Sequence, residues 1–296
     1  MTTDAPSQGQ TSGRPETADD IVRQVDVQPA GNGVWSPPLF LNPHRNVVEG
    51  GQLLAQACVA ASRMVPGKRV TTAHAIFSRP ARYDLPLAVQ VTELRAGRQF
   101  STIGVDIVQS AKLHTSVMLL MDAGGTSLYH HQPEMPDVAG PEFFPLQAMS
   151  VPGREVRFVG DTYQSQTTVP GKPRHLAWIR YDRLPDDQVL HNALIAQPAN
   201  LLTINASMRP HGVIEAEAHH AFSTGVLDLA FQFHEDADLT DWVLYDNIAF
   251  YAGRGLVCGQ GNVFSRQGKL LASYKVQAMV REFDQAQRER DPSRAM

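Results

Sequence analysis

The chain has few cysteines, no long apolar run and no concentration of positive charge. Only two cysteines, Cys58 and Cys258, occur among 296 residues, and each lies in an apolar stretch. Two such thiols suit neither a disulfide framework nor a paired-cysteine zinc site, so we expect both to be buried and inert in a reducing cytoplasm. No apolar run approaches the roughly 18 residues that a membrane-spanning helix needs, so we expect no membrane span.

Charge and motif content exclude further classes. The chain has 26 Lys and Arg against 30 Asp and Glu, for a formal net charge of −4, and its basic residues are scattered. Scattered basic residues do not form the positively charged patch that binds nucleic acid, so we expect no nucleic-acid partner. There is no glycine-rich phosphate loop and no nucleophile elbow. The pairs His130-His131 and His219-His220 would point to opposite faces of a strand, so neither predicts a metal site, and we expect no cofactor.

Composition divides the chain into segments. Residues 1–20 are rich in Thr, Ser, Gln, Gly, Pro and Asp, and are predicted to be disordered; the charged residues 284–296 are expected to fray. Prolines crowd residues 132–173, which are predicted to be a linker without helix or strand. Two folded units remain, at residues 21–131 and 174–283.

These two units repeat one pattern. The string Ala96-Gly97-Arg98 recurs as Ala252-Gly253-Arg254, an offset of 156 residues, and Lys112-Leu113 recurs as Lys269-Leu270, an offset of 157. Since the offset is close to half the chain, it indicates two tandem copies rather than a solenoid.

Each unit is predicted to hold one helix followed by an antiparallel sheet. The first helix is rich in small residues, begins at Gly50-Gly51 and ends at Pro66-Gly67; the second covers 187–205 with a kink at Pro198. The expected strands are 71–79, 87–94 and 100–121 with a break near 110–111, then 214–221, 226–234, 243–250, 255–264 and 270–280. This is an α+β pattern in which two units could share one continuous sheet with two central helices.

Several strings, in this order and spacing, resemble the type II acyl-CoA thioesterase family, which is built as a double hotdog. The resemblance covers about residues 35–283. The matching strings are Gly50-Gly51-Gln52, His74 to Pro80 and Leu94 to Ser101 in the first unit, and Phe233-His234, Asp241 to Tyr245, Gly253-Arg254-Gly255 and Leu271 to Gln277 in the second. It implies an acyl-CoA substrate and a homo-oligomer.

The resemblance also implies a water-activating set with two changed positions. The family hydrolyses acyl-CoA to free acid and CoA with an Asp on the second helix, a Thr on a strand and a Gln on the last strand. The Gln position corresponds to Gln277. Asn200 stands at the Asp position, and Val226, eight residues before His234, at the Thr position. An amide cannot accept a proton at neutral pH, so the general base is missing at its expected place.

Two residues near Val226 are candidates to replace the missing groups. Thr224 lies two residues upstream, so its hydroxyl would share the face of Val226 on a strand, and Asp228 is expected to share that face as well. Asp228 would then be a substitute base. Its ordinary interpretation is a structural ion pair.

The start of the first helix offers a second candidate base, Glu49. It precedes Gly50-Gly51, whose free N–H groups would stabilise a thioester oxyanion, as would their counterpart near Leu190. Its ordinary interpretation is a stabiliser of the helix N-terminus. His74 lies in an apolar strand, so a core histidine is the expected interpretation and a catalytic histidine is the alternative.

The main hypothesis is therefore a cytoplasmic, weakly active acyl-CoA thioesterase. Asn200, Gln277, Thr224 and Asp228 would act on water and carbonyl, and Glu49, Gly50, Gly51, His74 and Val226 would line the substrate site. The alternative is a non-catalytic acyl-thioester-binding protein that kept the fold. A hotdog enoyl-thioester hydratase would need an Asp/His pair at the loop and helix start that neither copy shows.

Overall fold

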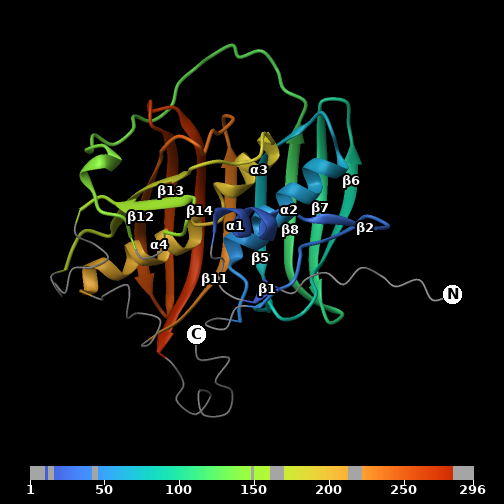
Figure 1. The fold of residues 1–296 in the computed structure, drawn as a ribbon, viewed down its shortest axis with the longest axis horizontal. Helices are drawn as coiled ribbons and strands as arrows, with labels where there is room; N and C mark the ends of the chain where they lie inside the picture. Colours follow the sequence, from blue (N-terminus) through green and yellow to red (C-terminus); the bar gives the residue numbers. More distant parts are fainter. Residues whose placement is uncertain are drawn as a thin grey trace.

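The computed structural model describes residues 11–12, 17–41, 46–147, 150–160, 170–212 and 222–282, and most of its strands form one sheet (Figure 1). Across this 12-stranded sheet the order is β2 (Gln28–Gly31), β3 (Val34–Ser36), β6 (Ala88–Ala96), β7 (Phe100–Gln109), β8 (Lys112–Asp122), β5 (Arg69–Phe77), β11 (Phe222–Phe233), β14 (Leu270–Glu282), β13 (Leu256–Ser265), β12 (Val243–Gly253), β10 (Arg174–Tyr181) and β9 (Arg154–Phe158). The first unit thus supplies one half of the sheet and the second unit the other. Two short parallel strands, β1 (Thr11–Ser12) and β4 (Phe40–Leu41), pair apart from it.

Helices cover one face of the sheet (Figure 1). They are α1 (Ala18–Val25), α2 (Gly50–Met64), α3 (Gln188–Leu194) and α4 (Ala199–Met208), with the 3-10 turns η1 (Pro141–Phe143) and η2 (Arg209–His211). Every residue of α2 from Gly50 to Ala61 is buried, because small side chains let the sheet and the other helices approach closely. Among the described residues, no helix is both long and apolar enough to cross a membrane.

This arrangement confirms the predicted double hotdog in its α+β layers. The turn between β7 and β8 lies at Ser110 and Ala111, whose φ angles of 50° and 57° break the long apolar run where a break was expected. Pro198 separates α3 from α4, as the predicted kink requires. The expected strand at 214–221 lies outside the described residues.

The two units meet at an antiparallel pair, β5 with β11, near the middle of the sheet. Thr72 pairs with Gln232, and Ile76 pairs with Asp228. The repeat offset of 156 relates Thr72 to Asp228 and Ile76 to Gln232, so it exchanges these two pairs. The units are therefore related by an approximate two-fold axis between β5 and β11, and their helices pack into one common apolar core.

Two segments are more ordered than composition predicted. Helix α1 begins at Ala18, inside the stretch expected to be disordered, and strand β1 lies there as well. Thr17 and Asp20 form a reciprocal capping box, with the Asp20 N–H donating to the Thr17 hydroxyl at 3.2 Å and the Thr17 N–H to the Asp20 carboxylate at 3.0 Å. This local signal outweighs the polar composition around it.

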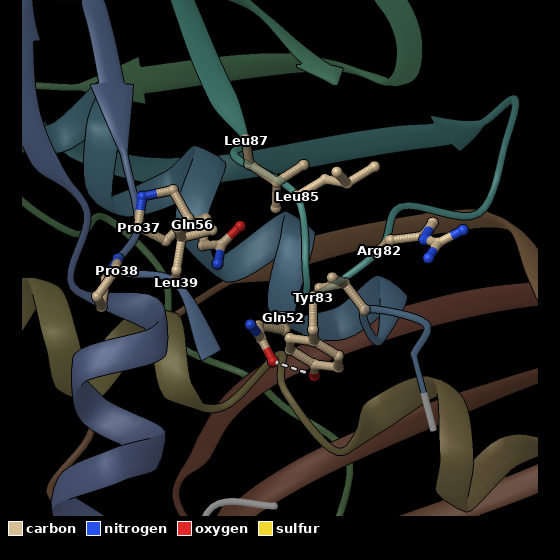
Figure 2. Close-up of a pocket in the computed structure, with 10 residues that line it drawn as sticks. Pro37, Pro38, Leu39, Gln52, Gln56, Arg82, Tyr83, Leu85 and Leu87 are labelled. Carbon is tan, nitrogen blue, oxygen red and sulfur yellow. Dashed lines mark hydrogen bonds between the residues drawn. The ribbon is translucent and has the colours of Figure 1, made fainter. Parts of the chain in front are cut away.

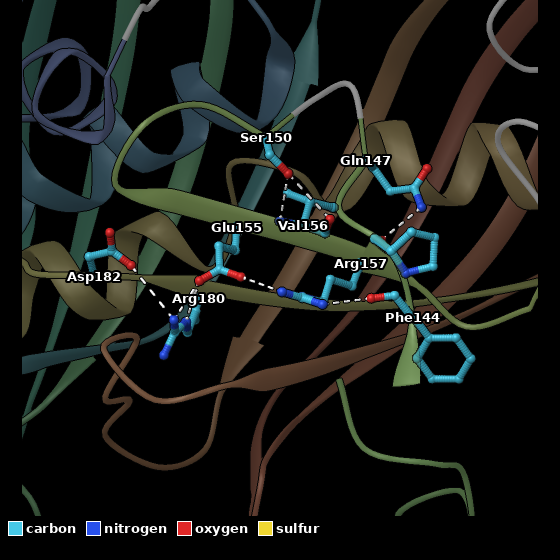
Figure 3. Close-up of polar contacts among 9 residues, drawn as sticks. Phe144, Gln147, Ser150, Glu155, Val156, Arg157, Arg180 and Asp182 are labelled. Atoms are coloured by element: carbon cyan, nitrogen blue, oxygen red, sulfur yellow. Dashed lines mark hydrogen bonds and ion pairs between the residues drawn. The ribbon is translucent and has the colours of Figure 1, made fainter. Parts of the chain in front are cut away.

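The proline-rich segment also contains a strand, β9, which corrects its interpretation as a pure linker. Its five residues lack proline and alternate between buried and half-buried, so they suit the edge of the sheet beside β10. Figure 3 shows the carboxylate of Glu155 in β9 between the guanidinium groups of Arg157 and Arg180. The second unit of the sheet thus extends back to Arg154.

Candidate active site

The start of α2 lies against the break between α3 and α4. The backbone N–H of Gly51 donates to Oδ1 of Asn200 at 3.0 Å, in a place where both groups are buried. A Cβ at Gly51 would lie 2.4 Å from the carbonyl oxygens of Ala196 and Gln197. Glycine is therefore required for this close approach, and it brings the helix start to Asn200.

Val226 covers the same helix start from β11. A Cβ at Gly50 would lie 2.2 Å from Cγ1 of Val226 and 3.1 Å from the ring of Phe77. The structure thus brings together Gly50, Gly51, Asn200 and Val226, four of the residues named from the sequence. Only one of them, Asn200, carries a polar side chain.

A β-bulge in β11 separates Asp228 from this group. The pairing of β11 with β14 shifts between Val226 and Asp228, so Val226 lies opposite the buried Ala278, whereas Asp228 lies opposite the exposed Gln277. The prediction that Asp228 shares a face with Thr224 and Val226 is therefore wrong. The extra residue in the bulge reverses the alternation of side chains.

Thr224 keeps the inner face, two residues upstream of Val226. It pairs with Val280, which packs against the apolar core with Phe222 and Val226. Its hydroxyl thus lies further along β11 than the contact between Val226 and Gly50.

Gln277 lies on the outer face of the sheet. Its amide nitrogen is 3.5 Å from Sγ of Cys258, on the neighbouring strand β13. The adjacent residues on the helix side of β14, Val276 and Ala278, are buried and apolar. Gln277 and Asn200 consequently face opposite sides of one sheet, and no amide from this part of β14 reaches the start of α2.

Asp228 and His74 form a pair on this outer face. Nε2 of His74 is 2.7 Å from Oδ2 of Asp228, and the side chains are 48% and 30% exposed. His74 is therefore not the core histidine that its apolar neighbours suggested, because it occupies the exposed positions of the alternation in β5.

Glu49 adjoins α2 through its backbone. Its extended backbone places its carbonyl oxygen to accept from the N–H of Leu53 at 3.1 Å, and its side chain makes no hydrogen bond that caps the helix. Glu49 is half-buried at the helix start.

Two cavities in the described part of the chain lie beside α2, and neither is lined by Gly50, Gly51, Asn200 or Val226. One of them, of about 10 Å³, lies where the Tyr83 hydroxyl donates to Gln52 (Figure 2). It holds no more than a water molecule. The other, of about 190 Å³, lies between the C-terminal half of α2 and α3. Within the described ranges, no group of three or more His, Cys, Asp or Glu side chains is arranged to hold a metal ion.

Comparisons with known proteins agree with this fold. Residues 41–122 match the family described as acyl-CoA thioesterase N-terminal domain, and residues 154–284 match the family described as acyl-CoA thioesterase. The acyl-CoA thioesterase 2 of Haemophilus influenzae is 27% identical over 258 residues, which cover 79% of this chain and 87% of that protein. The human acyl-coenzyme A thioesterase 8 is 26% identical over 261 residues, 78% of this chain and 80% of that protein.

Solved structures extend the likeness to almost the whole fold. A TesB protein of Mycobacterium avium subspecies paratuberculosis has a TM-score of 0.75 and 28% identity, over 89% of this chain and 99% of its own. The acyl-CoA thioesterase II TesB2 of Mycobacterium marinum has a TM-score of 0.74 and 25% identity, over 90% and 99%. A protein from Alicyclobacillus acidocaldarius, described as having a hot dog fold, shares the fold with a TM-score of 0.70 at 16% identity. With both halves matched in order, this chain belongs to the type II acyl-CoA thioesterase family.

Proposed function

We propose that the protein binds acyl-CoA thioesters and hydrolyses them slowly, because an amide, that of Asn200, stands at the start of α2 where a general base is needed. The observation that carries this proposal is the hydrogen bond from the Gly51 N–H to Oδ1 of Asn200. A backbone N–H can only donate, so the partner atom of Asn200 is its oxygen and its NH₂ group points elsewhere. An amide held this way has no site for a proton from an attacking water.

Val226, Asp228 and Gln277 do not replace that base. Val226 has no hydroxyl and packs on Gly50, while Asp228 and Gln277 lie on the other face of the sheet. Water attacking a thioester beside Asn200 would therefore keep its proton through the addition step. Loss of a positioned general base costs about 10² to 10⁴ in rate.

The test is the release of free thiol from a panel of short to long acyl-CoAs. Wild type is expected to turn over slowly, and Asn200→Asp combined with Val226→Thr to raise kcat/KM by about 10² or more, the scale of a restored base. Asn262→Asp makes the same chemical change on the outer face of β13 and controls for the added charge. Fast wild-type turnover, or a double variant no faster than this control, would contradict the proposal.

A second candidate is a hydrolase whose base has moved, and the pair of His74 and Asp228 at 2.7 Å favours it. In that case wild type is fast, and Asp228→Asn or His74→Gln abolishes turnover while Asn200→Asp changes it little. Glu49→Gln tests the remaining carboxylate near the start of α2. Fast turnover that survives all three single changes would exclude each of these groups as the base.

The outer face of the sheet supports the expected homo-oligomer. Its central strands expose apolar side chains, among them Ile76 at 47%, Met118 at 51% and Leu120 at 39%. Burial of this face against a second copy removes apolar surface from water. Light scattering should report a mass above that of the monomer, and Met118→Glu should lower it; a monomeric wild type would contradict this expectation.

A further inference from the structure

The approximate two-fold axis gives the start of α2 a counterpart elsewhere in the molecule. The repeat offset of 156 relates Val226, which covers Gly50, to Val70 on β5. It relates Thr224 and Gly225, which precede Val226, to Lys68 and Arg69. These three residues line the cavity of about 190 Å³ between α2 and α3.

The two places are filled differently. At the start of α2, the side chain of Val226 lies directly on Gly50, and Gly51 lets the backbones meet. At the counterpart, α3 begins with Gln188 and Val189, and both of these residues line the cavity. The start of α3 has no glycine pair that would allow a close approach of backbones, and the cavity lies beside it.

This cavity is amphipathic. The apolar part of its wall comes from Cys58, Val70, Val189, Ala193 and Phe233, and the polar part from Ser62, Lys68, Arg69, Gln188, Asn192 and Asp236. Burial raises the pKa of the Cys58 thiol to about 12, so this sulfur stays protonated and belongs to the apolar wall.

Two cations border the cavity. Nζ of Lys68 donates to the hydroxyl of Ser101 at 2.7 Å and to the carbonyl oxygen of Gly97, and Nη2 of Arg69 donates to the carbonyl oxygen of His234 at 2.8 Å. In the part of the chain that the structure describes, neither cation forms an ion pair with a carboxylate. The one carboxylate in the wall, Asp236, accepts from Nδ2 of Asn192 at 3.2 Å. The Ser101 hydroxyl in turn donates to Oε1 of Glu93 at 3.3 Å, so Lys68 is linked to a carboxylate only through this hydroxyl.

The volume limits what can enter. A cavity of about 150 Å³ holds benzene, so one of 190 Å³ has room for an acyl group of roughly six to eight carbon atoms. Sites that enclose whole drug-sized ligands are larger, about 300 to 1,000 Å³, so a bigger molecule must leave its remainder outside.

We propose that this cavity is a second acyl site, separate from the start of α2, and that it holds the acyl group of a short-chain CoA thioester, with Lys68 and Arg69 facing the anionic CoA part. The proposal rests on the proposed function, since it takes the same class of ligand, and adds a second binding site to it. The apolar wall accounts for the acyl chain, and the two cations account for a polyanionic head group.

The test is calorimetric titration of the full chain with S-hexyl-CoA, a thioether that cannot be hydrolysed, and with S-hexadecyl-CoA. Wild type is expected to bind the hexyl compound at least tenfold more tightly than the hexadecyl compound. Ser62→Phe, which fills the cavity from α2, is expected to weaken hexyl binding at least tenfold. Thermal unfolding of this variant checks that it is folded.

Charge variants keep the test decisive if Ser62→Phe does not fold. Lys68→Met and Arg69→Met are each expected to weaken binding about threefold to tenfold and to reduce its dependence on salt, whereas Lys68→Arg preserves it. Lys112→Met, at the exposed turn between β7 and β8, should leave affinity unchanged. Wild-type binding that none of the cavity variants alters would overturn this site while leaving the proposed function intact. Failure of wild type to bind either thioether would overturn the proposed function itself, and with it this site.

Discussion

The two units have the same strand register but different chemistry in their cores. In the second unit, the Tyr274 hydroxyl donates to Oδ1 of Asn247, and the Thr203 hydroxyl donates to the same oxygen at 3.2 Å. Nδ2 of Asn247 donates to the carbonyl oxygen of His175 at 3.2 Å. Burial raises the pKa of Tyr274, which keeps its hydroxyl a neutral donor. This cluster is buried and hydrogen-bonded throughout.

The first unit has valines at the equivalent positions. Val105 pairs with Val91 and with Val117, just as Gly261 pairs with Asn247 and with Tyr274 in the second unit. A Cβ at Gly261 would lie 2.3 Å from the ring of Tyr274, so a glycine makes room where the first unit fills space with Val105. The two units share the strand pairing and not the polarity of the side chains beneath it. The starts of α2 and α3 differ in the same way, since their places in the fold are equivalent and their side chains are not.

The largest effect is expected from Asn247→Val, which gives the second unit the side chain of the first. It removes the shared partner of Tyr274 and Thr203, and buried polar groups left unpaired cost about 1 to 3 kcal/mol each. We expect the free energy of unfolding to fall by roughly 2 to 4 kcal/mol in urea titrations. Adding Tyr274→Phe should cost less than the sum of the single changes. Strict additivity would show that these residues do not act as a cluster.

Gly51→Ala tests whether the close packing at the start of α2 requires a glycine. The added Cβ meets two backbone oxygens at 2.4 Å, and backbone cannot move aside as a flexible side chain can. Overpacking of this kind costs about 1 to 3 kcal/mol. Gly125→Ala is the matched control, because a Cβ there meets nothing within 4 Å. Equal thermal stability of the two variants would contradict the close approach at Gly51.

The pH dependence of stability distinguishes the second unit further. Burial, with the positive charge of Arg209, lowers the pKa of His175 from its ordinary value to about 3. Between about pH 3 and pH 6.5, His175 is therefore protonated in the unfolded chain and neutral in the folded one. The free energy of unfolding is highest above about pH 6.5 and falls as the pH drops from there towards 3.

We expect this histidine to contribute a loss of roughly 1 to 2 kcal/mol between pH 7 and pH 5. The measurement is urea unfolding of wild type and His175→Gln at both pH values. The variant should lose less stability on acidification than wild type. Parallel curves would mean that His175 takes up its proton without unfolding.

Much of the fold could be predicted from the sequence. The repeat, α2, the break at Pro198 and the antiparallel strands follow from local signals, namely glycine and proline positions and apolar alternation. Strand β9 could not be predicted, because it is stabilised by pairing with β10 and not by the composition of its own segment. Helix α1 has a local signal too, the capping box of Thr17 and Asp20, but the polar composition of residues 1–20 points to disorder and hides it.

The candidate site was harder to predict, since it depends on which face a side chain occupies. Asn200, Val226 and the glycine pair meet because helix packing places them together. Gly225 inside the strand is a local signal for a bulge, but it does not fix which residue is the extra one, and the bulge after Val226 is what moves Asp228 to the outer face. The cavity beside Val70 follows only from the two-fold relation together with the side chains at the start of α3.

The smallest effect is expected at the edge of the sheet, where the two ends also differ. Strand β2 closes the first unit with four exposed residues, whereas β9 closes the second with Glu155 between Arg157 and Arg180 (Figure 3). Burial raises the pKa of Glu155, but the hydrogen bonds and charges of Arg180 and Arg157 lower it by more. The ionised carboxylate therefore stabilises the edge above about pH 4.3, and this contribution is lost as the pH falls through the lowered folded pKa.

Glu155→Gln should accordingly cost about 1 kcal/mol at pH 7, since charged hydrogen bonds at a partly exposed edge are discounted by solvent. The matched control is Glu235→Gln, which removes the exposed pair of Glu235 with Lys269 and should change stability by less than about 0.5 kcal/mol. Both are read from urea unfolding at pH 7 and again at pH 3, where the cost at Glu155 should shrink because the wild-type carboxyl is becoming protonated. A cost at Glu155 no larger than that at Glu235 would show that β9 is held by its backbone pairing with β10, as β2 is held by its pairing with β3.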